Sequence, residues 1–339
     1  MGDEESQLSF FGLREQPFAP TADPLYFYAT REHKECLFRL WNSVDARHGI
    51  AVVLGNYGTG KTALLRKLLT GMAAAKERYQ TAVIASPIPS WTSFALLEAI
   101  VAQFGVQPPR RSFAAYIESL NGYLLQHRDR INTLIIDDAQ NLNKRGQLEL
   151  LRLAQNLETH QYKLLNLVLF AQLEWIEVLR AAPNFEQRIN MTFTLRPVLL
   201  EETRHLIEFR LDQAGAIAGL APVFDDGAVR VIHAFAEGNP RVIVTLCRNA
   251  LLLASQIKGR EIGPEIILHT IEKTTVPDAE KRARAVAAAR LAPTASTSVA
   301  ANLREAAGLA VHRLAPGSRE ERASQLLLRA ASRAKAPPG

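Results

Sequence analysis

A glycine-rich stretch, GNYGTGKT at residues 55–62, combines residue types that together can bind phosphate. Gly55 and Gly60 allow the backbone to curl so that its N–H groups point toward phosphate oxygens. Lys61 can reach the terminal phosphates, and the hydroxyl of Thr62 can bind Mg²⁺. The spacing G-x-x-x-x-G-K-[ST] therefore predicts a nucleotide-binding loop. Its residues are Gly55, Asn56, Tyr57, Gly58, Thr59, Gly60, Lys61, Thr62 and Ala63.

Two adjacent carboxylates end a second apolar stretch, LIIDDAQNL at residues 134–142. A phosphate loop needs an acidic residue at the end of a neighbouring strand to hold Mg²⁺, and Asp137 fits that role together with Thr62. Asp138 stands where many such ATPases carry the carboxylate that polarises the attacking water. Two carboxylates can lie side by side there because the cation offsets their repulsion. The expected cofactors are ATP and Mg²⁺, and the alternative is a solvated acidic turn.

Five apolar runs alternate with helical patterns in the first two thirds of the chain. This alternation predicts a parallel sheet with helices on both faces, and the continuous apolar character of the runs favours burial on both faces. One run precedes the phosphate loop and a helical pattern follows it, which is the context that the motif requires. The runs are residues 50–55, 81–86, 133–137, 164–171 and 191–195.

After Pro197 the strand-like runs stop and amphipathic helices follow. We therefore predict a P-loop core over 31–197, a helical lid domain over 198–276, and a basic, Ala/Arg-rich and largely flexible tail over 277–339. Residues 1–30 are predicted to be an aromatic segment that packs on the core. Its rings could instead wall an adenine base, although packing is the commoner role of such clusters. They are Phe10, Phe11, Phe18, Tyr26, Phe27 and Tyr28.

The formal net charge of +6 is unevenly distributed. The tail 277–339 holds 11 Lys and Arg against 5 Asp and Glu, which leaves 29 residues of each sign in the rest of the chain. A basic tail can contact nucleic acid or an anionic membrane, or it can be a solvated extension. Cys36 and Cys247 are too few for a disulfide framework and read as buried small hydrophobes. With no signal peptide and no window of about 18 apolar residues, we expect a cytoplasmic protein without membrane insertion.

Taken together, these motifs resemble those of the AAA+ ATPases of the ExeA/GspA (general secretion pathway protein A) type, which are related to pilus-biogenesis ATPases. The resemblance spans about residues 9–275 and includes FFGLREQPFAPTADPLYFY at 10–28, QRI at 187–189 and EGNPRVIVTLCRNALLLA at 237–254. It implies an α/β P-loop NTPase fold of the AAA+ kind, with a parallel sheet and a C-terminal helical lid. It also implies hydrolysis of ATP to ADP and phosphate by a ring or a nucleotide-dependent homo-oligomer.

The resemblance implies roles for three more polar residues. Gln172 matches a sensor near the γ-phosphate, and a solvated strand end is the alternative. Arg188 matches the arginine that points at a neighbouring subunit's nucleotide, and an internal salt bridge is the alternative. Arg241 matches the lid arginine that senses nucleotide. Where the family commonly has D-E-A-Q, this chain has D-D-A-Q, so the shorter Asp138 implies slow turnover or a different water geometry.

Three functions fit these observations. The first is an ATPase that assists assembly of a secretion or type IV pilus machine through an envelope-assembly protein partner. The second is a DNA-binding regulator of transposition, of the TnsC type, that works with a transposase. The third is a nucleotide-bound scaffold with almost no turnover. The possible DNA contacts in the second case are Arg110, Arg111, Lys144 and Arg145.

Overall fold

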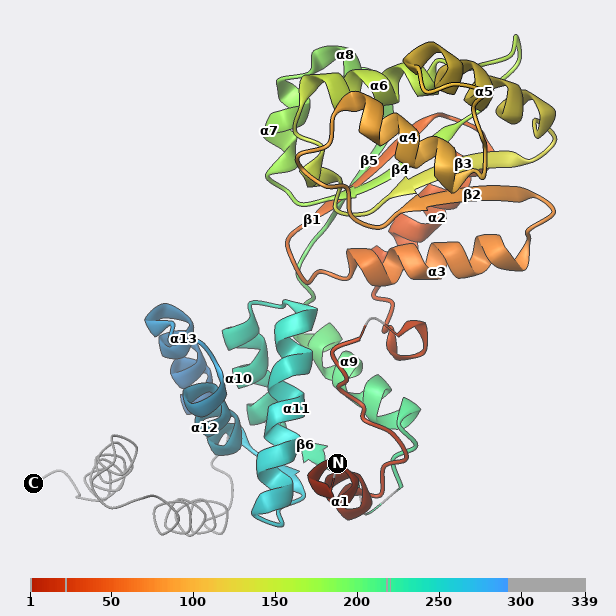
Figure 1. The fold of residues 1–339 in the computed structure, drawn as a ribbon. Helices are drawn as coiled ribbons and strands as arrows, with labels where there is room; N and C mark the ends of the chain where they lie inside the picture. Colours follow the sequence, from red (N-terminus) through yellow and green to blue (C-terminus); the bar gives the residue numbers. More distant parts are fainter. Residues whose placement is uncertain (1, 22, 218, 220, 292–339) are drawn as a thin grey trace, which may run out of the picture. The chain divides into compact units, whose positions relative to one another are not determined.

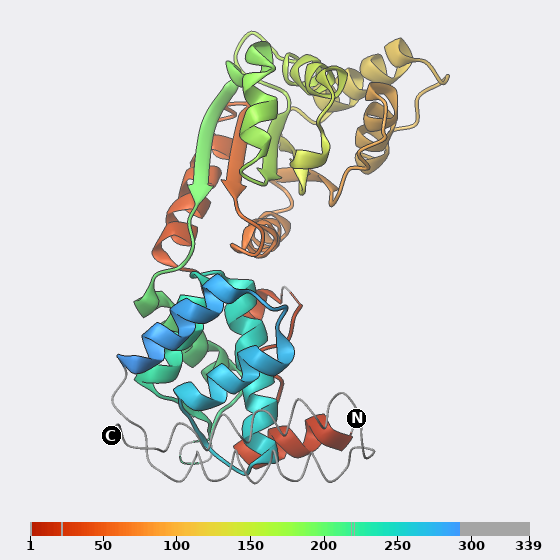
Figure 2. The same cartoon turned by 90° about the vertical axis from the view of Figure 1, so that its left-hand side faces the viewer.

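The computed structural model describes residues 2–21, 23–217, 219 and 221–291, and they form two compact units (Figures 1 and 2). One unit spans Thr21–Val198, and the other combines the described residues up to Pro20 with those from Leu199 onward. The boundary after Val198 lies next to the one predicted at Pro197. Among the described helices, none has both the length and the apolar character that crossing a membrane requires.

The first unit is a five-stranded parallel sheet covered by helices on both faces (Figure 1), as the alternating pattern predicted. The strand order is β2-β3-β4-β1-β5. The strands are β1 (Ile50–Gly55), β2 (Tyr79–Ile84), β3 (Ile131–Ile136), β4 (Asn166–Ala171) and β5 (Ile189–Leu195). The helices are α2 (Arg31–Asp45), α3 (Lys61–Ala74), α4 (Ser93–Gln103), α5 (Phe113–Gln126), α6 (Arg145–Gln155), α7 (Trp175–Arg180) and α8 (Pro183–Glu186), with single turns η1 (Pro24–Tyr26) and η2 (Ala139–Asn141).

The central strands are buried on both faces because two separate apolar cores flank the sheet. In β1, Ala51 and Val53 pack in the core formed with α2 and α3. Val52 and Leu54 pack in the opposite core, formed with α4, α5 and α6. The edge strand β5 shows alternating burial, and the other edge strand, β2, is partly buried at several positions. The uninterrupted apolar runs therefore reflect double burial, as expected for parallel strands between helical layers.

The strand order corrects one expectation. We expected Asp137 to follow a strand next to β1, but β4 lies between β3 and β1. The connection from β1 through α3 leads to β2 at the far edge, and β3 and β4 then fill the space between. The carboxyl ends of β1 and β3 still lie at the same edge of the sheet, because all five strands are parallel.

The second unit is mostly helical, as predicted, and it also contains a short strand pair. β6 (Val223–Phe224) and β7 (Glu261–Ile262) form a two-stranded parallel sheet, so the expectation that strands stop after Pro197 was wrong. Phe224 and Ile262 are buried, which explains why such short strands persist. The helices are α9 (Leu200–Gln213), α10 (Asp226–Ala236), α11 (Pro240–Gln256), α12 (Pro264–Thr274) and α13 (Ala279–Arg290), joined by α1 (Gly2–Phe11).

The N-terminal segment divides between the two units, which differs from the expectation that all of residues 1–30 pack on the P-loop core. In the helical unit, Phe11 is fully buried and the backbone N–H of Arg14 donates to the carbonyl of Ala214 at 2.8 Å. Phe18 is also fully buried, with its ring edge-on to Phe224. Packing is therefore the role of Phe11 and Phe18.

The predicted tail begins later than expected. Helix α13 packs against α10, with Ala285 fully buried and Arg282 paired with Glu272 at 2.9 Å. Alanine at 285 gives the close contact that a small residue allows. The remainder of the predicted flexible tail, from residue 292, lies outside the described residues.

Both cysteines are buried and unpaired, as their apolar surroundings predicted. Burial raises the pKa of the Cys36 thiol to about 12, so the thiolate form is disfavoured. Burial likewise raises the pKa of the Cys247 thiol. Both side chains therefore act as small apolar residues.

Phe170 lies in the middle of β4 with none of its side chain exposed. We predict that Phe170→Ala lowers the free energy of unfolding of the α/β unit by about 3–5 kcal/mol, because it leaves a cavity in a closed core. Urea unfolding of the full chain measures the change. The same substitution at Phe38, which is 65% exposed on α2, is the matched control and should change stability by less than about 0.5 kcal/mol. Equal midpoints for the two variants would contradict the assigned core.

Candidate nucleotide-binding site

The predicted phosphate loop connects the carboxyl end of β1 to the first turn of α3. Gly58 and Gly60 have φ angles of 83° and 95°, in the left-handed region that glycine adopts readily. Gly55 is required for a different reason, because a Cβ there would lie 2.7 Å from the Thr59 hydroxyl oxygen. The loop thus has the tight backbone path that the motif predicted.

The Lys61 ammonium lies within the loop. Its Nζ donates to the carbonyl oxygens of Gly55 at 2.7 Å and Asn56 at 3.0 Å. Burial lowers the pKa of Lys61, while the negative charges of Asp137 and Asp138 oppose that shift. The ammonium therefore sits where phosphate oxygens can replace the two carbonyls as its partners.

Thr62 and Asp137 meet at the same edge of the sheet. The Thr62 hydroxyl donates to Asp137 Oδ2 at 2.8 Å, and Asp137 Oδ1 accepts the backbone N–H of Asp138 at 3.0 Å. Burial raises the pKa of Asp137, although the hydrogen bonds from Thr62 and Asp138 act in the opposite direction. Neighbouring oxygens around an octahedral Mg²⁺, with bonds of 2.0–2.1 Å, lie about 2.9 Å apart. The Thr62 and Asp137 oxygens therefore fit two adjacent positions of such an ion.

Asp138 is held by a residue that the sequence analysis did not single out. Gln140 Nε2 donates to Asp138 Oδ1 at 3.0 Å, and Gln140 Oε1 accepts the backbone N–H of Gln172 at 3.2 Å. Gln140 thus links the candidate catalytic carboxylate to the end of β4, where Gln172 follows the strand. The available signal was the position of Gln140 within the D-D-A-Q stretch, two residues after Asp138.

Arg188 does not belong to this site. It precedes β5, whose first residue, Ile189, pairs with Ile50 at the start of β1. The phosphate loop begins at Gly55, at the opposite end of β1, so a rise of about 3.3 Å per residue separates the two by roughly 20 Å. Arg188 is exposed, and its guanidinium forms no ion pair or hydrogen bond within the part of the chain that the structure describes. Glu158 is paired with Lys163, and the Arg188 charge contributes less to lowering the pKa of Glu158, so an internal salt bridge stays the alternative.

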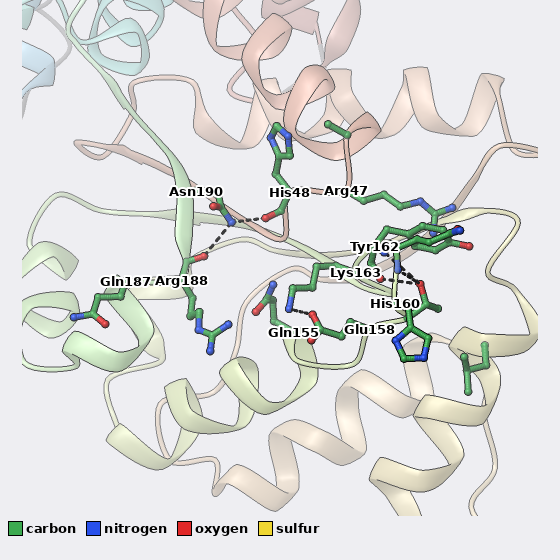
Figure 3. A pocket seen from close by; sticks show the side chains of 14 residues that line it. Arg47, His48, Gln155, Glu158, His160, Tyr162, Lys163, Gln187, Arg188 and Asn190 are labelled. Carbon is green, nitrogen blue, oxygen red and sulfur yellow. Dashed lines mark hydrogen bonds and ion pairs between the residues drawn. The ribbon is translucent and has the colours of Figure 1, made fainter.

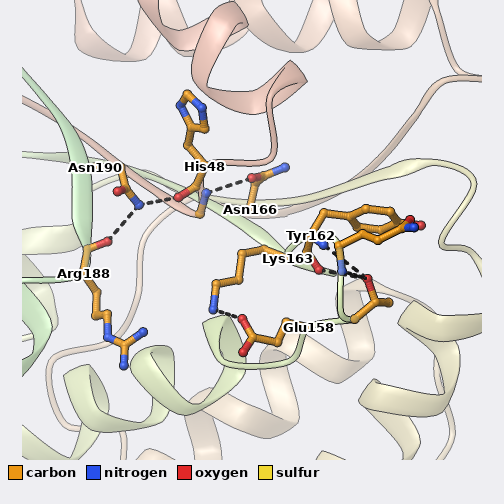
Figure 4. Close-up of polar contacts among 10 residues, drawn as sticks. His48, Glu158, Tyr162, Lys163, Asn166, Arg188 and Asn190 are labelled. Atoms are coloured by element: carbon orange, nitrogen blue, oxygen red, sulfur yellow. Dashed lines mark hydrogen bonds and ion pairs between the residues drawn. The ribbon is translucent and has the colours of Figure 1, made fainter.

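Arg188 lines a pocket at the amino-terminal ends of the strands, opposite the end that carries the phosphate loop (Figure 3). We call this end of the sheet the amino edge. The pocket has a volume of about 1140 Å³ and is rich in polar side chains. Lys163 pairs with Glu158, and the side-chain amide of Asn190 donates to the carbonyls of His48 and Arg188 (Figure 4). The buried Gln155 Oε1 has no hydrogen-bond partner among the described residues. The pocket thus contains an exposed cation, Arg188, and an acceptor without a partner among the described residues, Gln155 Oε1.

Arg241 lies in the helical unit, at the first turn of α11. Its backbone N–H donates to Asn239 Oδ1 at 3.0 Å, so Asn239 caps the helix and the Arg241 side chain is not needed for capping. Its role as a nucleotide sensor stays a prediction.

Two of the four candidate DNA contacts are engaged within the unit. Arg111 pairs with Glu98 at 2.6 Å, and Lys144 Nζ donates to the carbonyls of Ser90 and Trp91 at 3.0 and 3.2 Å. Both groups therefore have a structural role, which weakens their assignment as DNA contacts.

Residues 44–179 match the protein family described as "AAA domain". That stretch of the chain is therefore similar to an AAA domain. Over 250 residues it is 33% identical to general secretion pathway protein A of Aeromonas hydrophila. That match covers 72% of this chain but 44% of the relative, so the chain spans less than half the length of that protein. The resemblance read from the motifs is confirmed.

Solved structures have a fold similar to that of this chain. The ORC2 protein of Aeropyrum pernix in ADPNP–ADP complexes aligns with a TM-score of 0.54 and 16% identity, over 90% of this chain and 88% of that one. Cdc6p of Pyrobaculum aerophilum aligns with a TM-score of 0.56 and 20% identity, over 78% and 72%. These likenesses concern the fold alone, and the predicted AAA+ fold class is confirmed.

Asp137 generates a prediction about stability without Mg²⁺. Burial raises the pKa of the Asp137 carboxyl, so the folded α/β unit holds the carboxyl proton more tightly than the unfolded chain does. The charged form of Asp137 therefore lowers the stability of the fold as the pH rises through the raised pKa. Asp137→Asn keeps the shape and removes the charge, because its amide oxygen can accept the Asp138 N–H while its NH2 group donates to the Thr62 hydroxyl. We expect its melting temperature in Mg²⁺-free buffer at pH 8 to equal or exceed that of the wild type, with any gain disappearing toward pH about 4.

Thermal unfolding between pH 4 and 8 measures this difference. The matched control is Glu118→Gln, which neutralises an exposed carboxylate on α5 and should show no such pH-dependent gain. A variant of Asp137 that melts well below the wild type at pH 8 would contradict the assigned electrostatics.

Proposed function

We propose that this chain is a Mg²⁺-dependent ATPase that hydrolyses ATP to ADP and phosphate as a homo-oligomer. The observation that carries the proposal is the meeting of Lys61, Thr62, Asp137 and Asp138 at one edge of the sheet. A lysine within a phosphate loop, two oxygens at magnesium spacing and an adjacent carboxylate form the set that phosphoryl transfer to water requires.

Each residue has a distinct part in the proposed reaction. The loop N–H groups and Lys61 would hold the β- and γ-phosphates, and Thr62 and Asp137 would hold Mg²⁺. When bound, Mg²⁺ would neutralise charge that develops on the transferred phosphoryl group. Asp138 orients the attacking water and accepts its proton. Gln140 fixes the orientation of Asp138 and makes its position depend on the end of β4.

The proposed oligomer follows from the position of Arg188. An exposed arginine roughly 20 Å from its own phosphate loop cannot stabilise charge on a phosphate bound there. It can act only on nucleotide held by another copy, and its position at a polar pocket on the amino edge suits a contact with a second chain.

The proposed purpose is assembly of a secretion or type IV pilus machine, through an envelope-assembly protein. Its support is the 33% identity to a protein named for general secretion, over 72% of this chain. A role on DNA has weaker support, because Arg111 and Lys144 have partners within the unit.

We predict that the purified chain hydrolyses ATP in the presence of Mg²⁺, slowly but above a Lys61→Ala blank. The assay measures phosphate release at fixed salt, with and without duplex DNA. A rate that is independent of DNA favours the assembly function, and strong stimulation by DNA favours the transposition alternative. A rate equal to that of Lys61→Ala under both conditions would refute the ATPase proposal.

The oligomer proposal predicts complementation between two inactive variants. Arg188→Ala alone should lose most hydrolysis, since such trans-acting arginines contribute roughly 10³-fold or more to the rate. Mixing it with Lys61→Ala should restore activity, because each Lys61→Ala chain supplies an intact Arg188 to a functional loop on its neighbour. The control is Arg180→Ala, which removes an exposed arginine eight residues earlier and should retain activity alone. No recovery on mixing would show that Arg188 does not act between copies.

A further inference from the structure

His33 touches the phosphate loop from outside the motif. It lies in the first turn of α2 with 3% of its surface exposed, and its Nε2 is 3.0 Å from the carbonyl oxygen of Thr59. Its Nδ1 is 2.7 Å from the Thr30 hydroxyl oxygen and 3.3 Å from the Thr30 backbone nitrogen. Because a backbone N–H can only donate, Nδ1 is the acceptor and Nε2 carries the proton. His33 therefore donates a hydrogen bond to Thr59 in the loop.

That bond sets the direction of one loop peptide. In a planar trans peptide the C=O and the next N–H point in opposite directions. When His33 holds the Thr59 carbonyl, the N–H of Gly60 points away from the imidazole, to the side open to phosphate. Glycine at 60, with φ of 95°, would otherwise allow this peptide to rotate at little cost and turn a carbonyl toward the anion.

The imidazole is fixed in place by its surroundings. A Cβ at Gly60 would lie 2.8 Å from His33 Nε2, so the ring rests directly on the glycine. The ring of Phe27 packs edge-on against it, with centroids 5.1 Å apart. Thr30 holds the other ring nitrogen. Such a ring cannot swing away from the loop without losing all three contacts.

Helix capping alone does not account for a histidine here. Thr30 and His33 form a capping box at the start of α2, and the usual residue at the position of His33 is Glu or Gln. One acceptor satisfies the cap. The cap uses Nδ1 only, and the second imidazole nitrogen, Nε2, is the one that contacts the Thr59 carbonyl.

We infer that His33 is a positioning residue for nucleotide binding, which acts by holding the Thr59–Gly60 peptide in the orientation that presents the Gly60 N–H to phosphate. The inference rests on the proposed function, in that the loop must bind a nucleotide. It adds a residue outside the loop on which the affinity for the phosphates depends.

Two amide substitutions separate the cap from the loop contact. The side chain of His33→Gln is long enough to place its amide nitrogen near the position of Nε2 and its oxygen near Thr30. The amide of His33→Asn reaches only the position of Nδ1, so it keeps the cap and loses the loop contact. Comparing them isolates the bond to Thr59.

The measurement is titration of the full chain with Mg²⁺ and the fluorescent nucleotide mant-ATP, with Lys61→Ala as the blank. We expect His33→Asn to bind about five- to tenfold more weakly than the wild type, as loss of one hydrogen bond implies, and His33→Gln to stay within about twofold. Both variants should still fold, which a cooperative thermal unfolding transition without nucleotide checks. Wild-type affinity in His33→Asn, or equal weakening in both variants, would overturn the inference.

The outcomes also separate this inference from the proposed function. If the wild type binds no better than Lys61→Ala, the proposed function fails and the inference fails with it. If the wild type binds and His33→Asn binds equally well, only the inference fails. A nitrogen NMR spectrum of the wild-type imidazole, assigned by comparison with His33→Gln, adds a test that needs no folded Asn variant. The proton should be on Nε2, and a proton on Nδ1 would refute the bond to Thr59.

Discussion

The hydrogen bond between Thr62 and Asp137 is the contact on which the site depends. It joins residues 75 positions apart, one after β1 and the other after β3, although β4 separates those strands. It can form because the strands are parallel, so their carboxyl ends share one edge, and because the first turn of α3 reaches across β4. The contact thereby brings the phosphate loop next to the turn that contains Asp138.

The polar side chains of the site have hydrogen-bond partners within the chain. Lys61 binds the loop carbonyls, Thr62 binds Asp137, and Gln140 binds Asp138. Buried polar groups left unpaired would be costly, so these internal bonds stabilise the fold around the site. Nucleotide binding would then exchange one set of partners for another rather than create interactions where none existed. Such an exchange favours a loop whose peptides already face the right way, which is the part we assign to His33.

Local patterns were enough to predict the loop, the five strands and the helical character of the second unit. Those features depend on neighbours in sequence, such as the glycines of GNYGTGKT and the apolar run before Asp137. Contacts between residues that are distant in the sequence could not be predicted from such local patterns. Nothing near Phe18 in the sequence indicates that it packs on Phe224, and nothing near His33 indicates that it meets Thr59, 26 residues later. Gln140 lies beside a recognised motif, but its role depends on the hydrogen bond that it accepts from the backbone N–H of Gln172, 32 residues away.

The two edges of the sheet explain why a second copy matters to the proposed reaction. Parallel strands place the loop at the carboxyl edge and Arg188 at the amino edge, and a packed sheet cannot bend to bring them together. A contact that joins one edge of a chain to the other edge of the next uses two different surfaces, so it is head-to-tail. Repetition of such a contact gives a ring when the rotation closes and a filament when it does not. Under the proposed function, assembly adds the arginine of one copy to the phosphate loop of the next. Movements within one chain cannot bring its own Arg188 to its own loop.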